Sequence, residues 1–220
     1  MPIFYWLSRW FVERGYVVVL PQRRGFGATG GEFAEANDTC LNPDHASAGL
    51  AAADDIEAVM NFMLAQPFVK PNSAVVVGIS AGGWATLALA SRHPAGMQRA
   101  IAFAPGRGGH AWGKAGEICG EEKLVSATAD FGAGTQVPTL WLYSRNDTFF
   151  PPRVAQQLVN AWTKAGGDAE FHLLPAYNVE GHDIANDRAG WMLWGNILEQ
   201  FLDTPPAERA RMSASFIPSE

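Results

Sequence analysis

A serine lies between two glycines at a spacing that can present it as a nucleophile. Residues 78–82 read Gly-Ile-Ser-Ala-Gly, which is the pattern Gly-x-Ser-x-Gly centred on Ser80. The apolar run 73–79 predicts a buried strand before the serine, and the periodicity of 82–93 predicts a helix after it. The glycines permit a sharp turn, and the N-terminus of a helix stabilises negative charge beside it. We therefore expect Ser80 to be exposed at the carboxyl edge of a sheet.

Later loops provide the two partners that a reactive serine needs. Asp147 follows a predicted strand over 137–143, and His182 follows another over 169–174. In a parallel sheet these loops meet at the same edge as Ser80. A serine hydroxyl requires a histidine to take its proton and a carboxylate to orient the imidazole. The order Ser80, Asp147, His182 therefore predicts acyl transfer on a catalytic triad.

Other histidines and aspartates compete for these roles. A histidine at a helix C-terminus, as at position 93, or within a strand, as at position 172, is more simply structural. His45 and His110 lie in predicted loops that could border the site. Asp183 and Asp187 are alternatives for the acid, but Asp183 adjoins His182 and would reach its ring with poor geometry. We expect His182 and Asp147 to fill the two roles.

The elements that must position these residues alternate between helix and strand, which predicts an α/β fold with a mostly parallel sheet. We expect one domain over 1–203, a glycine-rich irregular insert over about 104–136 that covers the pocket like a cap, and a loose tail over 204–220. Helices are predicted over 3–14, 45–66, 82–93, 151–166 and 187–202, and strands over 16–20, 73–79, 99–103, 137–143 and 169–174.

Composition excludes several classes of protein. The chain has 220 residues, of which 48% are hydrophobic and 17% charged, so it is too apolar to be disordered. Its net charge is −6 and its basic residues do not cluster beyond Arg23-Arg24, which disfavours a nucleic-acid partner. No apolar stretch is long enough for a membrane span, and residues 1–12 lack the features of a signal peptide. The oligomeric state cannot be predicted.

Two further features bear on cofactors and on the compartment. Cys40 and Cys119 have no metal-ligand spacing, so they are either two free thiols or one bridge, and we expect no metal. A bridge would join the loop after the first predicted strand to the insert and would imply an oxidising compartment. Residues 25–30 fit Gly-x-Gly-x-x-Gly, but no strand ends directly before them and no helix opens after them. We therefore expect no dinucleotide and no other cofactor.

Taken together, four motifs resemble those of the α/β-hydrolases, nearest to the branch of dienelactone-hydrolase-like proteins and serine esterases. The resemblance covers residues 1–203, and its elbow carries Ser80 where dienelactone hydrolases carry cysteine. It implies that Ser80 is the nucleophile, His182 the general base and acid, Asp147 the orienting acid and the Ala81 N–H an oxyanion donor. The motifs are Pro-Gln-Arg-Arg-Gly-Phe-Gly at 21–27, Gly-Ile-Ser-Ala-Gly-Gly at 78–83, Arg-Asn-Asp at 145–147 and Gly-His-Asp at 181–183.

The resemblance also shapes the expectations about the N-terminus and the substrate. In the family, a strand and a His-Gly-type loop that supplies a second oxyanion donor precede the first helix seen here, so we expect either a longer native N-terminus or a shortened member. The protein is expected to be cytoplasmic as the chain stands, and exported if a longer N-terminus carries a signal or if the cysteines are bridged. A small acyl ester is the expected substrate, with an amide or peptide, or a catalytically impaired binding protein, as alternatives. Its pocket is expected to be lined by Trp112, Phe149, Phe150 and Tyr177.

Overall fold

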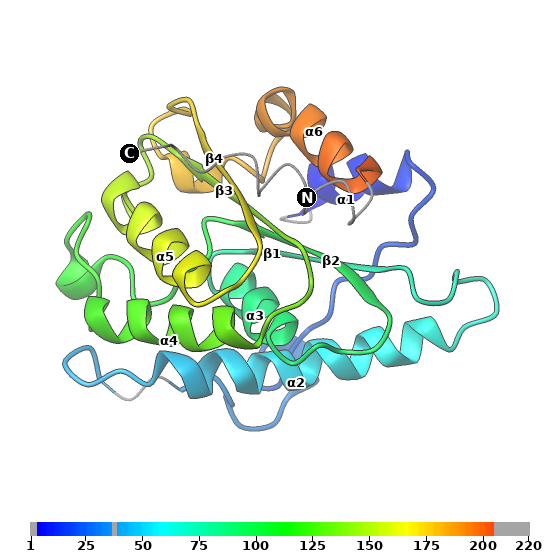
Figure 1. The fold of residues 1–220 in the computed structure, drawn as a ribbon, viewed down its shortest axis with the longest axis horizontal. Helices are drawn as coiled ribbons and strands as arrows, with labels where there is room; N and C mark the ends of the chain where they lie inside the picture. The colour runs from blue at the N-terminus through cyan, green and yellow to red at the C-terminus, as the bar shows by residue number, and fades with distance from the viewer. Residues whose placement is uncertain (1–3, 37–38, 205–220) are drawn as a thin grey trace.

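Helices and strands alternate along the chain, as the sequence predicts (Figure 1). The computed structural model describes residues 4–36 and 39–204. The tail predicted to be loose therefore lies, from residue 205 onward, outside the described residues. The strands are β1 (Ala74–Ile79), β2 (Met97–Phe103), β3 (Thr139–Ser144) and β4 (Ala169–Leu174), and the helices are α1 (Tyr5–Val12), α2 (His45–Leu64), α3 (Ala81–Ala90), α4 (Glu121–Gly134), α5 (Pro152–Lys164) and α6 (Arg188–Asp203).

The four strands form one parallel sheet in the order β1-β2-β3-β4. At its carboxyl edge Ile79 pairs with Phe103, and Ser144 pairs with Leu174. Helices connect β1 to β2, β2 to β3, and β3 to β4, as parallel neighbours require. The segments that leave β1, β3 and β4 therefore all start at the edge where Ser80, Asp147 and His182 were predicted.

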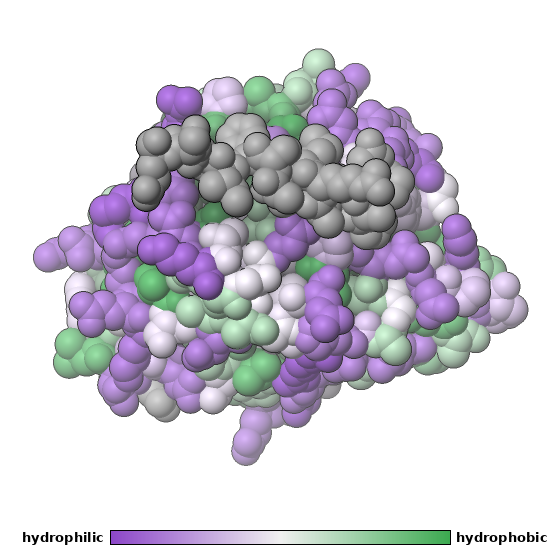
Figure 2. Space-filling model, viewed as in Figure 1, coloured by the Kyte–Doolittle hydropathy of each residue, from purple (hydrophilic) through white to green (hydrophobic). Residues whose placement is uncertain are grey.

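Helices cover both faces of this sheet (Figure 1). Helices α1 and α6 pack on one face, with Trp10 of α1 in edge-to-face contact with Trp194 of α6. Helices α2, α3, α4 and α5 lie on the other face, where Trp84 contacts Phe131. Figure 2 shows hydrophilic and hydrophobic side chains intermixed on the surface over α2 and α4. The two apolar layers confirm the α/β class and leave the carboxyl edge of the sheet to the loops.

The predicted strand over 16–20 is wrong: these residues form no strand. A strand needs a neighbouring backbone to receive its hydrogen bonds, and no described strand lies beside this segment or on the outer edge of β1. Two of its valines are largely exposed, Val17 at 54% and Val19 at 42%. The run of valines was read correctly as apolar, but periodicity alone cannot tell whether a pairing partner is present.

The prediction that 104–136 is irregular throughout is also wrong, because α4 occupies its second half. Leu124, Ala127 and Phe131 lie at i, i+3 and i+7 and are buried, with Thr128 between them. Helix α4 packs along α5 and belongs to the layer of helices on the sheet. The part of the predicted insert that precedes α4 is therefore restricted to 104–120.

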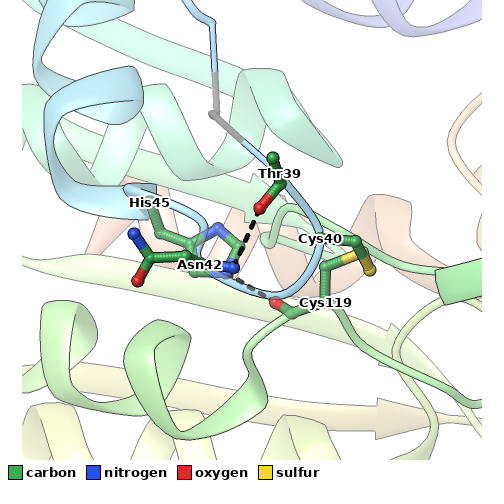
Figure 3. The surroundings of a disulfide bond; sticks show 5 residues. All are labelled: Thr39, Cys40, Asn42, His45 and Cys119. Atoms are coloured by element: carbon green, nitrogen blue, oxygen red, sulfur yellow. Dashed lines mark hydrogen bonds between the residues drawn. A yellow bond between two sulfur atoms is a disulfide. The ribbon is translucent and has the colours of Figure 1, made fainter.

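A disulfide joins Cys40 to Cys119, so the bridged alternative is the one the structure contains (Figure 3). The bridge connects the segment before α2 to the segment before α4, across 79 residues of sequence. His45, in the first turn of α2, adds a hydrogen bond of 2.8 Å between its Nε2 and the carbonyl oxygen of Cys119. No helix in the described part of the chain has the length and apolar character to cross a membrane.

Reducing this bridge is expected to lower the thermal stability of the protein. The bridge limits the unfolded chain by closing a loop of 79 residues, and loss of a native bridge typically costs about 2 to 5 kcal/mol. For a chain of this size the midpoint of thermal unfolding should fall by roughly 5 to 15 °C. Scanning calorimetry with and without a thiol reductant measures the shift, and the double substitution Cys40→Ser with Cys119→Ser should show the lowered midpoint without responding to reductant. An unchanged midpoint after verified reduction would contradict the prediction.

Candidate active site

Ser80 occupies a sharp turn between β1 and α3. Its backbone has φ 55° and ψ −122°, a conformation that L-residues rarely adopt and that persists only when the surroundings hold it. The Ser80 N–H donates to the carbonyl oxygen of Phe103 at 2.9 Å, which continues the pairing of β1 with β2. A Cβ on Gly78 would lie 2.1 Å from the backbone oxygen of Gly82, so only glycine permits this close return of the chain. The predicted elbow is therefore formed.

The Ala81 backbone N–H, predicted to be an oxyanion donor, is the first of helix α3. The first N–H groups of an α-helix have no acceptor within the helix, and they carry the positive end of its dipole. Ser80 is the residue that precedes the helix, so this N–H lies directly beside the serine. The position is suited to a developing negative charge.

Asp147 is buried in the loop after β3 and is held in one orientation. Its side chain accepts hydrogen bonds of 2.8 Å from the backbone N–H groups of Phe149 and Phe150 at Oδ1. Its other oxygen, Oδ2, lies 3.0 Å from Nδ1 of His182. A carboxylate only accepts, so this contact places a proton on Nδ1 and leaves the Nε2 lone pair of the neutral imidazole available. The predicted pairing of Asp147 with His182 is present.

The loop after β4 folds back across the end of β3, and this brings His182 to Asp147. The Gly181 N–H donates to the carbonyl oxygen of Asn146 at 3.3 Å. A Cβ on Gly181 would lie 2.5 Å from the Ser144 hydroxyl, so the close approach requires glycine. His182 therefore lies beside the end of β3, which is one strand nearer to β1 than the end of β4.

Packed groups link this histidine to the serine elbow. The carbonyl oxygen of Ser80 accepts a hydrogen bond of 3.3 Å from the backbone N–H of Gly106, in the loop after β2. Gly106 lies against the ring of Phe150, because a Cβ there would be 2.5 Å from Cε1 of that ring. The Phe150 ring lies in turn 5.7 Å from the His182 ring, measured between centroids. The residues predicted for the triad thus share one packed edge of the sheet.

The four predicted pocket residues do not all lie together. Phe149 stacks on His182 with ring centroids 4.4 Å apart, and Phe150 packs beside it. Trp112 is 64% exposed. Tyr177 belongs to the apolar layer with α1 and α6. Its burial, and to a smaller extent its hydrogen bond to the Asp187 carboxylate, raise the pKa of its hydroxyl to about 12. Phe149 and Phe150 are therefore the pocket candidates that contact the predicted site.

The competing side chains have other partners. Asp187 accepts from Tyr177 and from two N–H groups at the start of α6, and Asp183 accepts from the side chain of Asn186. His110 contacts the hydroxyl of Thr148 at 2.8 Å. The remaining histidines bond to Cys119, Gln136 and Glu170. None of these contacts reproduces the arrangement of Asp147 with His182.

Two groups of residues were missed by the sequence reasoning. Glu180 accepts from the backbone N–H of His182 at 2.9 Å and from that of Thr148 at 3.0 Å, and it caps the 3-10 turn that begins at Gly181 although glutamate is not a preferred capping residue. Glu35 is 1% exposed and pairs with Arg23 and Arg107. No basic pair was expected to hold a carboxylate, and these two arginines instead hold a carboxylate of the chain itself.

A parallel sheet with a serine elbow at its carboxyl edge and a buried Asp–His pair beside it defines an α/β-hydrolase, which confirms the resemblance found in the sequence. Residues 2–204 match the model of the prolyl oligopeptidase family, so the chain belongs to that family of serine hydrolases. No curated protein matches the chain.

Solved structures are similar to this chain at low sequence identity, and the first two below share its fold. Esterase PE8 has 21% identity and a TM-score of 0.51 over 75% of this chain and 66% of its own. A puromycin-hydrolyzing peptidase of Mycobacterium tuberculosis has 17% identity and a TM-score of 0.50 over 70% of this chain and 25% of its own. A protein of Klebsiella pneumoniae subsp. pneumoniae MGH 78578, described as a dienelactone hydrolase, has 18% identity and a TM-score of 0.46 over 73% of this chain and 62% of its own. The chain thus spans less than two thirds of the Klebsiella protein and about a quarter of the peptidase.

Proposed function

We propose that this protein cleaves a carboxylic acyl bond through a covalent acyl-enzyme on Ser80, with His182 as general base and acid and Asp147 as the orienting acid. The observation that carries the proposal is the Asp147–His182 contact of 3.0 Å. Two backbone N–H groups fix the carboxylate, and the carboxylate fixes the imidazole tautomer with Nε2 able to accept a proton. These features provide the oriented base that an activated serine needs, and the contact of the Ser80 hydroxyl with Nε2 is part of the proposal.

The reaction then proceeds in two halves. In the first, the Ser80 hydroxyl oxygen attacks the carbonyl carbon while its proton passes to Nε2 of His182. The oxyanion that forms is stabilised by the Ala81 N–H and by the N-terminus of α3. Collapse expels the leaving group, which receives the proton from His182. In the second half, water attacks the acyl-enzyme by the same route and regenerates the serine.

The proposed substrate is a small ester, and an amide or peptide is the second candidate. The ester is favoured because the sequence places no basic pair clearly to hold a charged group of the substrate, whereas the fold is shared with both esterase PE8 and a peptidase and does not separate the two. Membership of the prolyl oligopeptidase family favours the amide or peptide. Both reactions use the same acyl-enzyme, so the leaving group rather than the triad distinguishes them.

Labelling with a fluorophosphonate tests the proposal without knowledge of the substrate. The reagent phosphonylates an activated serine, and we expect one adduct by intact mass, located at Ser80 by peptide mapping. Protein unfolded in denaturant should not be labelled, because activation requires the folded arrangement. If folded protein is not labelled, the triad is not functional and a binding role on the same fold is favoured. A panel of p-nitrophenyl esters and aminoacyl anilides then separates the ester from the amide.

A further inference from the structure

A carboxylate joins the loop that carries Asp147 to the loop that carries His182. Glu180 receives at Oε1 the backbone N–H of Thr148 at 3.0 Å and the backbone N–H of His182 at 2.9 Å. Its Oε2 receives the hydroxyl of Thr148. Burial would raise the pKa of the Glu180 carboxyl, but the hydrogen bonds from Thr148 and His182 hold this pKa below its usual value. Glu180 is therefore ionised at neutral pH and can only accept in these contacts.

His110 is the next residue in this series of hydrogen bonds, through the Thr148 hydroxyl. The Thr148 hydroxyl has one proton, and that proton is donated to Glu180. Nε2 of His110 lies 2.8 Å from the same hydroxyl oxygen, so the histidine must be the donor there. A hydrogen-bonded chain thus runs from His110 through Thr148 and Glu180 to the backbone of His182.

Stacked aromatic rings also connect His110 to His182, through Phe149. The His110 ring lies parallel to the Phe149 ring, with centroids 3.7 Å apart and planes 9° apart. The Phe149 ring also stacks on the His182 ring, with centroids 4.4 Å apart and planes 27° apart. Phe149 also donates its N–H to Asp147. The segment 104–120 therefore reaches His182 by two routes, a polar one to its backbone and an aromatic one to its ring.

We propose that Glu180 is a positioning residue for His182, held in place by Thr148 and His110, and that it is needed to keep the imidazole in reach of both Asp147 and Ser80. The inference rests on the proposed triad. The 3-10 turn over Gly181–Asp183 is only three residues long, and its own hydrogen bonds cannot fix the imidazole. Glu180 supplies the missing restraint, because one oxygen binds the backbone on both sides of the gap between the two loops.

The matched pair Glu180→Ala and Glu180→Gln tests this role. The alanine variant loses all three hydrogen bonds, and we expect kcat for a p-nitrophenyl ester to fall by about 10 to 100-fold, as small displacements of catalytic groups do. KM should stay within about twofold, since Glu180 does not touch the substrate in this proposal. The glutamine variant keeps an acceptor oxygen for the two backbone N–H groups, so it should recover most of kcat.

In the glutamine variant, the tautomer of His110 is also expected to change. The introduced amide NH₂ donates to the Thr148 hydroxyl, which must then donate to His110, and the histidine adopts its other neutral tautomer. Adding His110→Phe retains the stacking on Phe149 and removes this dependence on the tautomer. We expect His110→Phe to lower kcat by about 2 to 5-fold in the wild-type background and to have no further effect with Glu180→Ala, because the chain is already broken.

Fluorophosphonate labelling distinguishes a failure of this inference from a failure of the proposed function. If the wild-type protein is not labelled at Ser80, the proposed function fails. If it is labelled, and Glu180→Ala is labelled as fast with an unchanged kcat, the positioning role is wrong. Glu199→Ala, which removes an exposed ion pair with Arg14, is the control for loss of a surface carboxylate. If Glu180→Ala does not fold, Glu180→Asp takes its place, because a carboxylate one methylene shorter cannot reach both backbone N–H groups, and an unchanged kcat in that variant would equally overturn the inference.

Discussion

Replacing Ser80 with alanine is expected to lower kcat for every ester or amide that the protein hydrolyses by at least about 10⁴-fold. The loss is large because the covalent step requires the hydroxyl oxygen, and no neighbouring group can replace it. Both serine and alanine carry a Cβ, so the strained backbone at φ 55° is equally available to the variant and the fold should be kept. The measurement is kcat on the best ester of the panel, together with fluorophosphonate labelling.

Ser91→Ala is the matched control for this substitution. Ser91 follows the last residue of α3, and among the contacts of the described residues its hydroxyl donates to the carbonyl oxygen of Ala88. It shares the helix with Ser80 but lies at the opposite end, so its loss should leave kcat within about twofold, as for surface substitutions without a special role. If Ser80→Ala retains more than a few per cent of the activity while folding normally, the assignment of the nucleophile is wrong.

The parts of the site that could be predicted are those specified by local sequence and by topology. A glycine two residues before Ser80 and another two residues after it already indicate the elbow. The parallel sheet then brings Asp147 and His182 to the same edge, because every strand ends there. The order of residues along the chain was therefore sufficient to anticipate the contact between Asp147 and His182.

The parts that could not be predicted depend on partners distant in sequence. The valines over 16–20 are as apolar as those of β1, but they form no strand because no described strand pairs with them. Helix α4 is a different case, since its buried residues do repeat with helical spacing and the many glycines before it obscured this pattern. Glu180 lacked a sequence signal for its contact with Thr148, which arises only when the two loops meet.

The segment before α2 is attached to the segment after β2 at two points, and these differ in chemistry. One is the disulfide between Cys40 and Cys119. The other is Glu35, which receives Arg107 at 3.0 Å and also pairs with Arg23. Arg107 directly follows Gly106, whose backbone N–H donates to the carbonyl oxygen of Ser80, so the ion cluster lies next to this hydrogen bond. Reduction of the disulfide should therefore affect stability more than activity, since the ion cluster remains to hold the edge beside Ser80.

Replacing Asp147 with asparagine is the second change with a large expected effect, and the structure dictates how it acts. Oδ1 receives two backbone N–H groups, so the introduced amide must place its oxygen there. Its NH₂ group then faces Nδ1 of His182, at the position of the present 3.0 Å contact. An NH₂ group donates, so Nδ1 must accept and the imidazole proton moves to Nε2. With Nε2 protonated, the imidazole cannot take the proton of Ser80, and we expect kcat to fall by about 10⁴-fold.

Asp183→Asn provides the control and also tests the competing carboxylate. Asp183 adjoins His182, and among the described contacts its carboxylate accepts from Asn186. We expect kcat of this variant to stay within about threefold, as for a substitution outside the hydrogen-bonded site. The proton position in Asp147→Asn can be observed directly by ¹⁵N NMR of the histidine ring, which separates the two neutral tautomers. If Asp183→Asn loses activity and Asp147→Asn keeps it, the acid has been assigned to the wrong residue. If Asp147→Asn loses activity while Nδ1 keeps its proton, the negative charge of the carboxylate, rather than its control of the His182 tautomer, is what the reaction requires.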